Sequence, residues 1–124
     1  MESILTSIKK LLGIPEEYEH FDGDIILHIN SVFMILNQLG VGPKEVYRIA
    51  DKEDHWLDFV TDYDDLDAVK SYVYLRVKQL FDPPQSSIIM ESQNRLIQEL
   101  EWRLNVKAEN KAVIDTENEK NQEY

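Results

Sequence analysis

Apolar residues recur every three or four positions along four stretches of the chain, which is the spacing of an amphipathic helix. The first stretch covers residues 1–12, and Gly13, with a proline two residues later, is typical of a helix end. The second begins at Asp22 or Asp24 and runs to about Leu39, where two glycines and a proline follow. This pattern predicts two helices joined by an acidic link.

Two further apolar stretches lie on either side of a pair of prolines. Asp65 to Phe81 predicts the third helix, and Ile88 to Leu104 predicts the fourth. Asp82-Pro83-Pro84 lies between them, and each proline removes a backbone donor and disfavours helical geometry in the residue before it. Ser86 and Ser87 then offer N-caps. We expect a rigid elbow between the third and fourth helices.

The segment from Val41 to about Asp54 is long for a connection in a small bundle, where roughly two to eight residues are usual. Connections of this length are often functional. After it, His55 to Phe59 predicts a single helical turn in which Trp56 caps the bundle.

The last part of the chain is polar. Residues 105–124 offer little apolar material beyond Val106, Val113 and Ile114. Burial of so few apolar groups cannot offset the entropy of ordering, so we expect a flexible tail that orders only on binding a partner. The β-branched pair at 113 and 114 favours an extended strand. The expected fold is therefore all-α: residues 1–104 form a small bundle of about four helices with a long loop between the second and third, and residues 105–124 form an extended C-terminal tail.

The composition argues against several classes of function but does not identify one. The chain has 124 residues, a formal net charge of -11 and no cysteine. One domain is expected at this length, and the charge argues against attraction to DNA phosphates or anionic membranes. Disulfide and thiolate chemistry are excluded. No apolar run approaches the roughly 18 residues of a membrane span, and the N-terminus has no leader pattern, so we expect a soluble intracellular product.

No set of residues has the spacing of a catalytic, cofactor-binding or metal site, and we expect none of the three. The histidines share no ligand spacing, and the acids from Asp62 to Asp67 lack the glycine and the final glutamate of a calcium loop. The serines after the elbow are explained by helix capping. The protein is therefore expected not to be an enzyme.

Trp102 and Arg103, near the end of the fourth predicted helix, are candidates for an interface. Trp102 falls outside the main apolar stripe of that helix, and Trp and Arg are enriched in interface hot spots. The alternative is a partly buried Trp beside a surface Arg. The nearby elbow favours the interface.

Five stretches together make the chain resemble the head–tail connector, or head-completion adaptor, proteins of tailed phages and prophages. They are ILTSIKKLLGI, DIILHINSVFMILNQLGVGP, HWLDF, VKSYVYLRVKQLFDPPQSS and NRLIQELEWRLNV, and they cover most of residues 3–106. The resemblance implies an all-α protein without catalytic residues or cofactors, which forms a ring of about twelve copies under the portal. Such a ring continues the DNA channel, lets DNA pass without sequence-specific binding, and receives the stopper or tail on its other side. It is made in the host cytoplasm and ends at the head–tail interface of the virion.

Three groups of residues are candidates for the contacts of such a ring. The subunit or portal interface would take residues around the elbow and the last helix: Tyr72, Tyr74, Phe81, Asp82, Pro83, Pro84, Trp102 and Arg103. Val113 and Ile114 would anchor the tail by adding a strand to a sheet edge of the portal. Val46, Tyr47 and Trp56 would face the stopper or tail. Aromatic residues on more than one side of the third helix suit the two different faces that a ring needs.

A second hypothesis is a small acidic regulatory module that masks a basic protein surface, such as that of a DNA-binding protein. Charge alone favours neither hypothesis. The two differ in stoichiometry, because an adaptor docks in many equivalent copies and a masking protein forms a small complex.

Overall fold

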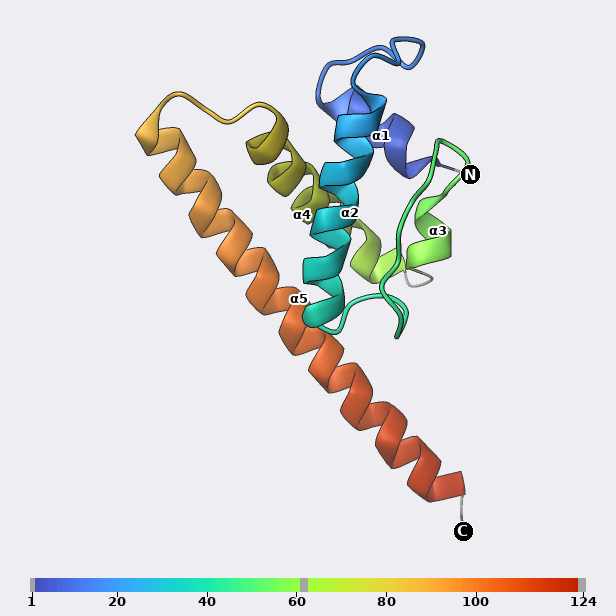
Figure 1. Cartoon of the computed structure of the whole chain (residues 1–124). Helices are drawn as coiled ribbons and strands as arrows, with labels where there is room; N and C mark the ends of the chain where they lie inside the picture. The colour runs from blue at the N-terminus through green and yellow to red at the C-terminus, as the bar shows by residue number, and fades with distance from the viewer. Residues whose placement is uncertain (1, 61–62, 123–124) are drawn as a thin grey trace.

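The chain is built from helices. The computed structural model describes residues 2–60 and 63–122, and Figure 1 shows how its helices are arranged. They are α1 (Ile4–Leu11), α2 (Asp22–Gln38), α3 (Trp56–Phe59), α4 (Tyr63–Phe81) and α5 (Ser87–Gln122). Within these ranges there is no strand, and one isolated bridge joins Ser3 to His55. The all-α expectation is confirmed.

The helix α4 packs against both α2 and α5 and holds the three long helices together. Its core residues have no accessible surface: Val69, Tyr72, Val73 and Val77. The side chains that α2 buries follow the predicted helical spacing: Ile25, Ile29, Val32, Phe33 and Leu36. The side chain of Tyr72 lies inside this core. Apolar residues on several sides of α4 therefore serve packing within one chain, where the sequence suggested a contact with a second subunit.

The helix ends follow the signals in the sequence. α1 ends two residues before Gly13, which has a positive φ of 80°. α4 ends at Phe81, directly before the Asp-Pro-Pro turn. The hydroxyl of Ser86 then accepts a hydrogen bond from the backbone N–H of Ile89 at 3.4 Å and caps α5. The elbow between the last two long helices is confirmed.

The long connection from Val41 to Asp54 is hydrogen-bonded to two helices, α2 and α1. Asn30 of α2 is buried; its Nδ2 donates to the carbonyl of Ile49 at 3.1 Å, and its Oδ1 accepts from the N–H of Ile49 at 2.8 Å. At the end of the connection, the N–H of Ile4 donates to the carbonyl of Asp54 at 3.0 Å. The loop is therefore an integral part of the fold.

Trp56 was expected to cap the bundle, and its side chain lies inside the core. It is 1% exposed, and its Nε1 donates to the hydroxyl of Ser7 at 2.7 Å. Its ring lies edge-on to Phe33 of α2, with 6.5 Å between the ring centroids. A side chain so enclosed supports the neighbouring loop and has no surface to offer a stopper or tail. The assignment of Trp56 to that contact is corrected accordingly.

The segment expected as an extended tail forms the second half of α5. This helix has 36 residues and is therefore about 54 Å long at 1.5 Å per residue. Figure 1 shows its C-terminal part projecting beyond the bundle; residues 109–122 are called the arm below. Prolonging a docked helix needs no new nucleus, since each added residue gains one backbone hydrogen bond. The strand expected at Val113 and Ile114 is therefore replaced by helix, while ordering of the arm by a partner stays a prediction.

A buried lysine ties the first two helices together. Lys9 is 2% exposed, and its Nζ donates to the carbonyls of Glu16 at 2.9 Å and Tyr18 at 2.8 Å. The same Nζ lies 2.8 Å from Oδ1 of Asp22 at the start of α2. A lysine near the C-terminal end of a helix ordinarily lies at the surface, where the helix dipole favours its charge. Instead, Lys9 fixes the path of the whole acidic link.

Replacing Lys9 with Met should lower the free energy of unfolding by about 2–4 kcal/mol, because two carbonyls and a carboxylate lose their partner. Urea denaturation followed by circular dichroism measures the loss. Lys10→Met makes the same charge change at the exposed neighbour and should cost less than about 0.5 kcal/mol. Equal losses in the two variants would contradict a stabilising role for the buried network.

Candidate assembly interface

A polar cluster attaches α5 to α4. The hydroxyl of Tyr72 donates to Oε2 of Glu101 at 3.0 Å, and Nη2 of Arg76 donates to the same oxygen at 3.1 Å. Nε of Arg76 also donates to the Tyr72 hydroxyl at 3.3 Å. Burial raises the pKa of Tyr72 from its ordinary value of 10.0 to about 12, against a lowering effect of Arg76 and with a further raising effect of Glu101. The tyrosine is therefore a neutral donor, and the cluster sets where α5 lies on α4.

A second set of contacts fixes α5 at the C-terminal end of α2. Nδ2 of Asn105 donates to the carbonyl of Leu39 at 3.2 Å, which satisfies an orphan acceptor of that helix end. Nζ of Lys107 lies 2.6 Å from Oδ1 of Asp65 on α4. α5 is thus held at two levels, and the arm begins directly after the second.

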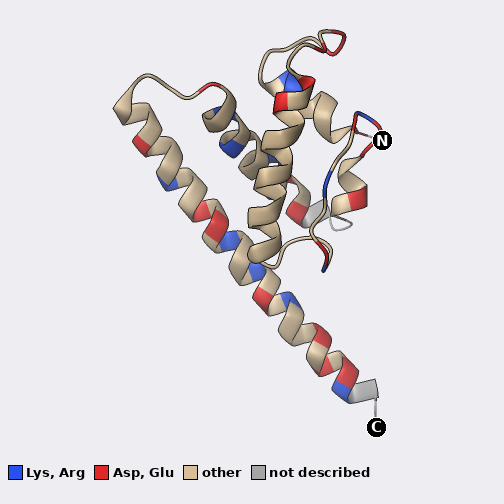
Figure 2. Cartoon of the chain, in the orientation of Figure 1, with Lys and Arg blue, Asp and Glu red and all other residues tan. Residues whose placement is uncertain are grey.

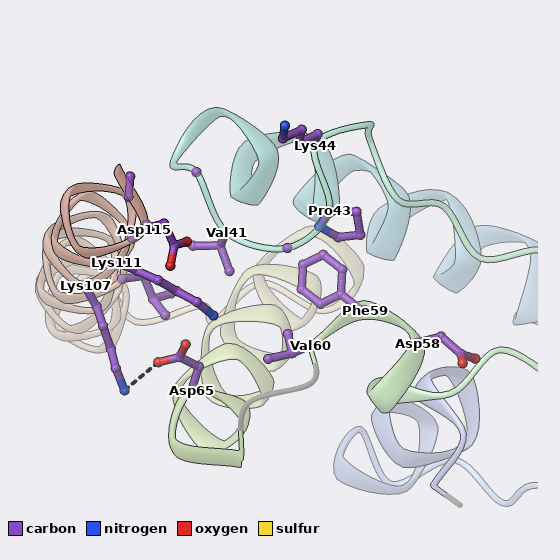
Figure 3. A pocket seen from close by; sticks show the side chains of 15 residues that line it. Val41, Pro43, Lys44, Asp58, Phe59, Val60, Asp65, Lys107, Lys111 and Asp115 are labelled. Carbon is purple, nitrogen blue, oxygen red and sulfur yellow. Dashed lines mark ion pairs between the residues drawn. The ribbon is translucent and has the colours of Figure 1, made fainter. Parts of the chain in front are cut away.

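A groove of about 540 Å³ opens between the start of the arm and the loop that follows α2 (Figure 3). Its floor is apolar and includes Val41, Phe59 and Val60. Its rim carries charges of both signs: Lys44, Asp58, Asp65, Lys107, Lys111 and Asp115. Gly42, with φ of 90°, lies against Phe59, and a Cβ there would overlap the ring. The loop can approach this closely only because the position is glycine.

The outward side of α5 is apolar in places and neutral in charge. Trp102 is 67% exposed and Ile88 is 75% exposed, and Leu96 is also exposed. The charged side chains among them form pairs one helical turn apart: Arg95 with Glu91 at 3.5 Å, and Arg103 with Glu99 at 2.6 Å. We call this surface, from Ile88 to Arg103, the α5 outer face. An exposed Trp within such a surface is typical of a protein contact.

Some of the elbow residues pack against the bundle, and others are exposed to solvent. The ring of Phe81 packs edge-on to Phe21 at 5.3 Å, so it closes the bundle next to the acidic link. Asp82 is exposed and lies 3.6 Å from Nζ of Lys78. Pro83 is exposed and Pro84 is partly covered. The elbow therefore presents a short, stiff surface at the start of α5.

The remaining residues that were predicted to make contacts differ in their exposure to solvent. Tyr72 is buried in the core and is corrected from an interface residue to the anchor of α5. Tyr74 and Tyr47 are partly buried, and Tyr47 packs against Phe33 and Phe59. The exposed members are Val46, Trp102, Arg103, Val113 and Ile114. They lie on the loop, on the α5 outer face and on the arm, so they form no single site.

Sequence reasoning missed an exposed stripe on α2. Leu27 is 61% exposed and Met34 is 52% exposed, with Ser31 and Gln38 on the same side of the helix. We call these four residues the α2 outer stripe. The available signal was the absence of Asp, Glu, Lys and Arg from residues 25–43, in a chain with 30% charged residues.

The described residues contain no group of three or more His, Cys, Asp or Glu side chains that could hold a metal ion. Asp62, part of the acidic run considered above, lies outside them. None of the helices described is both long and apolar enough to cross a membrane.

A family model described as phage connector protein matches residues 4–111. The match covers most of the chain and reaches from α1 into the arm. The chain belongs to the phage connector protein family. Among curated proteins and among solved structures, nothing matches the connector. The resemblance inferred from the five stretches is confirmed at the level of the family.

The family boundary agrees with the contacts of α5. Residue 111 is the last matched position, and it lines the groove together with Lys107 and Ala108. The matched region therefore comprises the bundle with α5 docked on it, and most of the arm lies beyond the match.

Replacing Tyr72 with Phe should lower the free energy of unfolding at neutral pH by about 1–2 kcal/mol, because Glu101 loses one buried donor. Urea denaturation measures it, and Tyr18→Phe removes a hydroxyl from an exposed tyrosine as the matched control. An effect no larger than that of the control would contradict the role of the cluster.

The same pair of proteins should respond differently to high pH. Because the folded-state pKa of Tyr72 is raised to about 12, its stabilising contribution is complete below pH 10 and is lost as the pH rises through 12. The wild type should lose about 2 kcal/mol more than Tyr72→Phe between these values. Parallel stability curves for both proteins from pH 9 to 12 would refute this.

Proposed function

We propose that the connector forms a ring under the phage portal, continues the DNA channel and offers its other side to the stopper or tail. The family match supports the connector role, and the projecting arm of α5 is the observation that carries the rest of the proposal. The resemblance implies about twelve copies, and a closed ring of this kind uses two different faces of each copy. The virion, at the junction of head and tail, is then its place of action.

The arm is suited to docking on the portal. It projects beyond the bundle, so a partner can pack against it (Figure 1). Val113 is 57% exposed and Ile114 is 55% exposed, and both lie on this projecting segment. A helix docks by placing such side chains in an apolar groove, so helix-in-groove binding takes the place of the expected strand addition. Val113 and Ile114 remain the proposed anchors.

The two ends of α5 would serve different partners. Figure 1 shows the elbow and the arm at opposite ends of this long helix. We assign the arm to the portal and the elbow, with exposed Asp82 and Pro83, to the stopper or tail. Residues 40–44 of the loop after α2 line the same groove as the start of the arm, so we assign this loop, with Val46 and Tyr47, to the portal side in this arrangement. This revises the expectation that the loop faces the stopper or tail.

The acidic composition suits a passage for DNA. Attraction between basic side chains and phosphates would hold DNA to a channel wall. A formal net charge of -11 per copy works against such binding. We therefore expect the ring to let DNA slide without reading its sequence.

The stoichiometry with the portal tests this function. Native mass spectrometry of the connector mixed with purified portal rings should show portal complexes that carry about twelve connector copies. The acidic masking module predicts small complexes of one or two copies with a basic protein instead. Absence of the connector from portal rings and from tail-less heads would overturn the proposal.

Cutting the chain after Lys111 tests the arm. The truncated protein keeps the Asn105 and Lys107 contacts and should therefore stay folded by circular dichroism. It should bind portal rings at least about 30-fold more weakly, the effect of losing a hot-spot contact.

A pair of full-length variants separates the anchors from the rest of the arm. Val113→Ser with Ile114→Ser should reproduce most of the loss. Asn110→Ser with Thr116→Ser, two polar positions of the same segment, should leave portal binding within about threefold of the wild type. If the truncated connector holds the portal as tightly as the full chain, the arm has no part in docking.

A further inference from the structure

We infer that neighbouring copies of the connector meet head to tail, with the α5 outer face of one copy packed on the α2 outer stripe of the next. The inference rests on the proposed ring and names the two faces that close it. Trp102 is the main anchor on one side, and Leu27, Ser31 and Met34 receive it on the other.

Charge selects these two faces. Two copies that each carry a formal charge of -11 repel wherever acid meets acid. Figure 2 shows α2 without charged residues beyond its first turns, while α5 alternates both signs along its length. The exposed charges of the α5 outer face are neutralised by the Glu91–Arg95 and Glu99–Arg103 pairs. These surfaces can approach another acidic copy without a like-charge cost.

The shape of the α2 outer stripe suits an inserted indole. Leu27, Ser31 and Met34 follow one another at intervals of four and three residues, so they lie next to one another on one side of α2. Ser31 is small, which leaves room between its two long neighbours. Its hydroxyl already donates to the carbonyl of Leu27 at 3.0 Å, so it needs no further partner when water is excluded. The Met34 thioether is flexible and makes favourable contacts with aromatic rings.

The two faces have similar extents. The α2 outer stripe spans about 16 Å from Leu27 to Gln38, and the apolar residues of the α5 outer face span about 21 Å from Ile88 to Trp102, at 1.5 Å per residue. They lie on different helices and are different in composition. A contact between unlike patches of identical chains is heterologous, and it closes into a ring when the rotation allows. A second copy is therefore the occupant that these faces fit, while the arm stays available for the portal.

Single cysteines provide the test, because the chain has none of its own. Met34→Cys and Trp102→Cys replace exposed side chains, so both proteins should fold. Treated with a short bis-maleimide, each alone should stay monomeric, and an equal mixture should give one dimer band. The double variant, with both cysteines in one copy, should give a ladder. Leu11→Cys mixed with Trp102→Cys should give no dimer, because exposed Leu11 lies on α1 outside both faces.

The cross-linking is carried out free in solution and on tail-less heads, so that weak association without the portal does not decide the outcome. No mixed dimer under either condition overturns the inference. So does a dimer from one variant alone at equal yield, because it would mean a symmetric contact. Sedimentation with heads tests the proposed function separately from the two faces. If the connector binds heads but the double variant gives no ladder, only the assignment of these two faces is refuted.

Blocking variants give a second readout. Met34→Glu and Trp102→Glu should each weaken self-association by about 30-fold or more, since each places an acid in an apolar contact. Mixed together, they should form dimers that grow no further, because each copy keeps one intact face. Continued growth of the mixture, or wild-type association of either variant, contradicts the inference.

Discussion

The docking of α5 on α4 is the interaction on which the rest of the arrangement depends. α5 is long but buries few apolar side chains fully, Ile97 and Leu104 among them. Because α5 buries little apolar area, the hydrogen bonds among Tyr72, Arg76 and Glu101 determine how α5 aligns with α4. These bonds can form in only one register of the two helices. Once that register is set, Asn105 reaches the end of α2 and the arm leaves the bundle along a fixed line. The position of every exposed residue of α5 follows from it.

The sequence predicted those features that depend on neighbouring residues. Helical periodicity, the proline elbow and the Ser86 cap are local, and each is found where expected. The sequence did not predict contacts between residues that are far apart in the chain. The Lys9 ammonium could not be matched to Asp22 and two carbonyls of the acidic link by spacing alone, and neither could Asn30 to Ile49. Tyr72 was misplaced for the same reason: an aromatic residue on a helix can face a second helix of its own chain as well as a partner.

The arm shows how context overrides composition. Residues 109–122 lack the apolar stripe that would fold them independently, and the β-branched Val113 and Ile114 favour strand. The docked part of α5 supplies the nucleus, so the segment continues as helix. Because the segment projects beyond the bundle, its low apolar content is that of an exposed surface. This is why the two anchors can be proposed for a partner although the conformation first expected for them was different.

Charge distribution links the fold to assembly. The acids gather on the link before α2 and in its first turn, on the long loop and along the arm, while the α2 outer stripe and the α5 outer face carry no net negative charge. Folding alone does not require this segregation, since Leu27 and Met34 are exposed and contribute little to the core. Charged residues at those positions would serve solubility better. Their absence has a physical explanation if acidic copies must lie side by side, because surfaces without net charge are the ones on which contact between such copies is favourable.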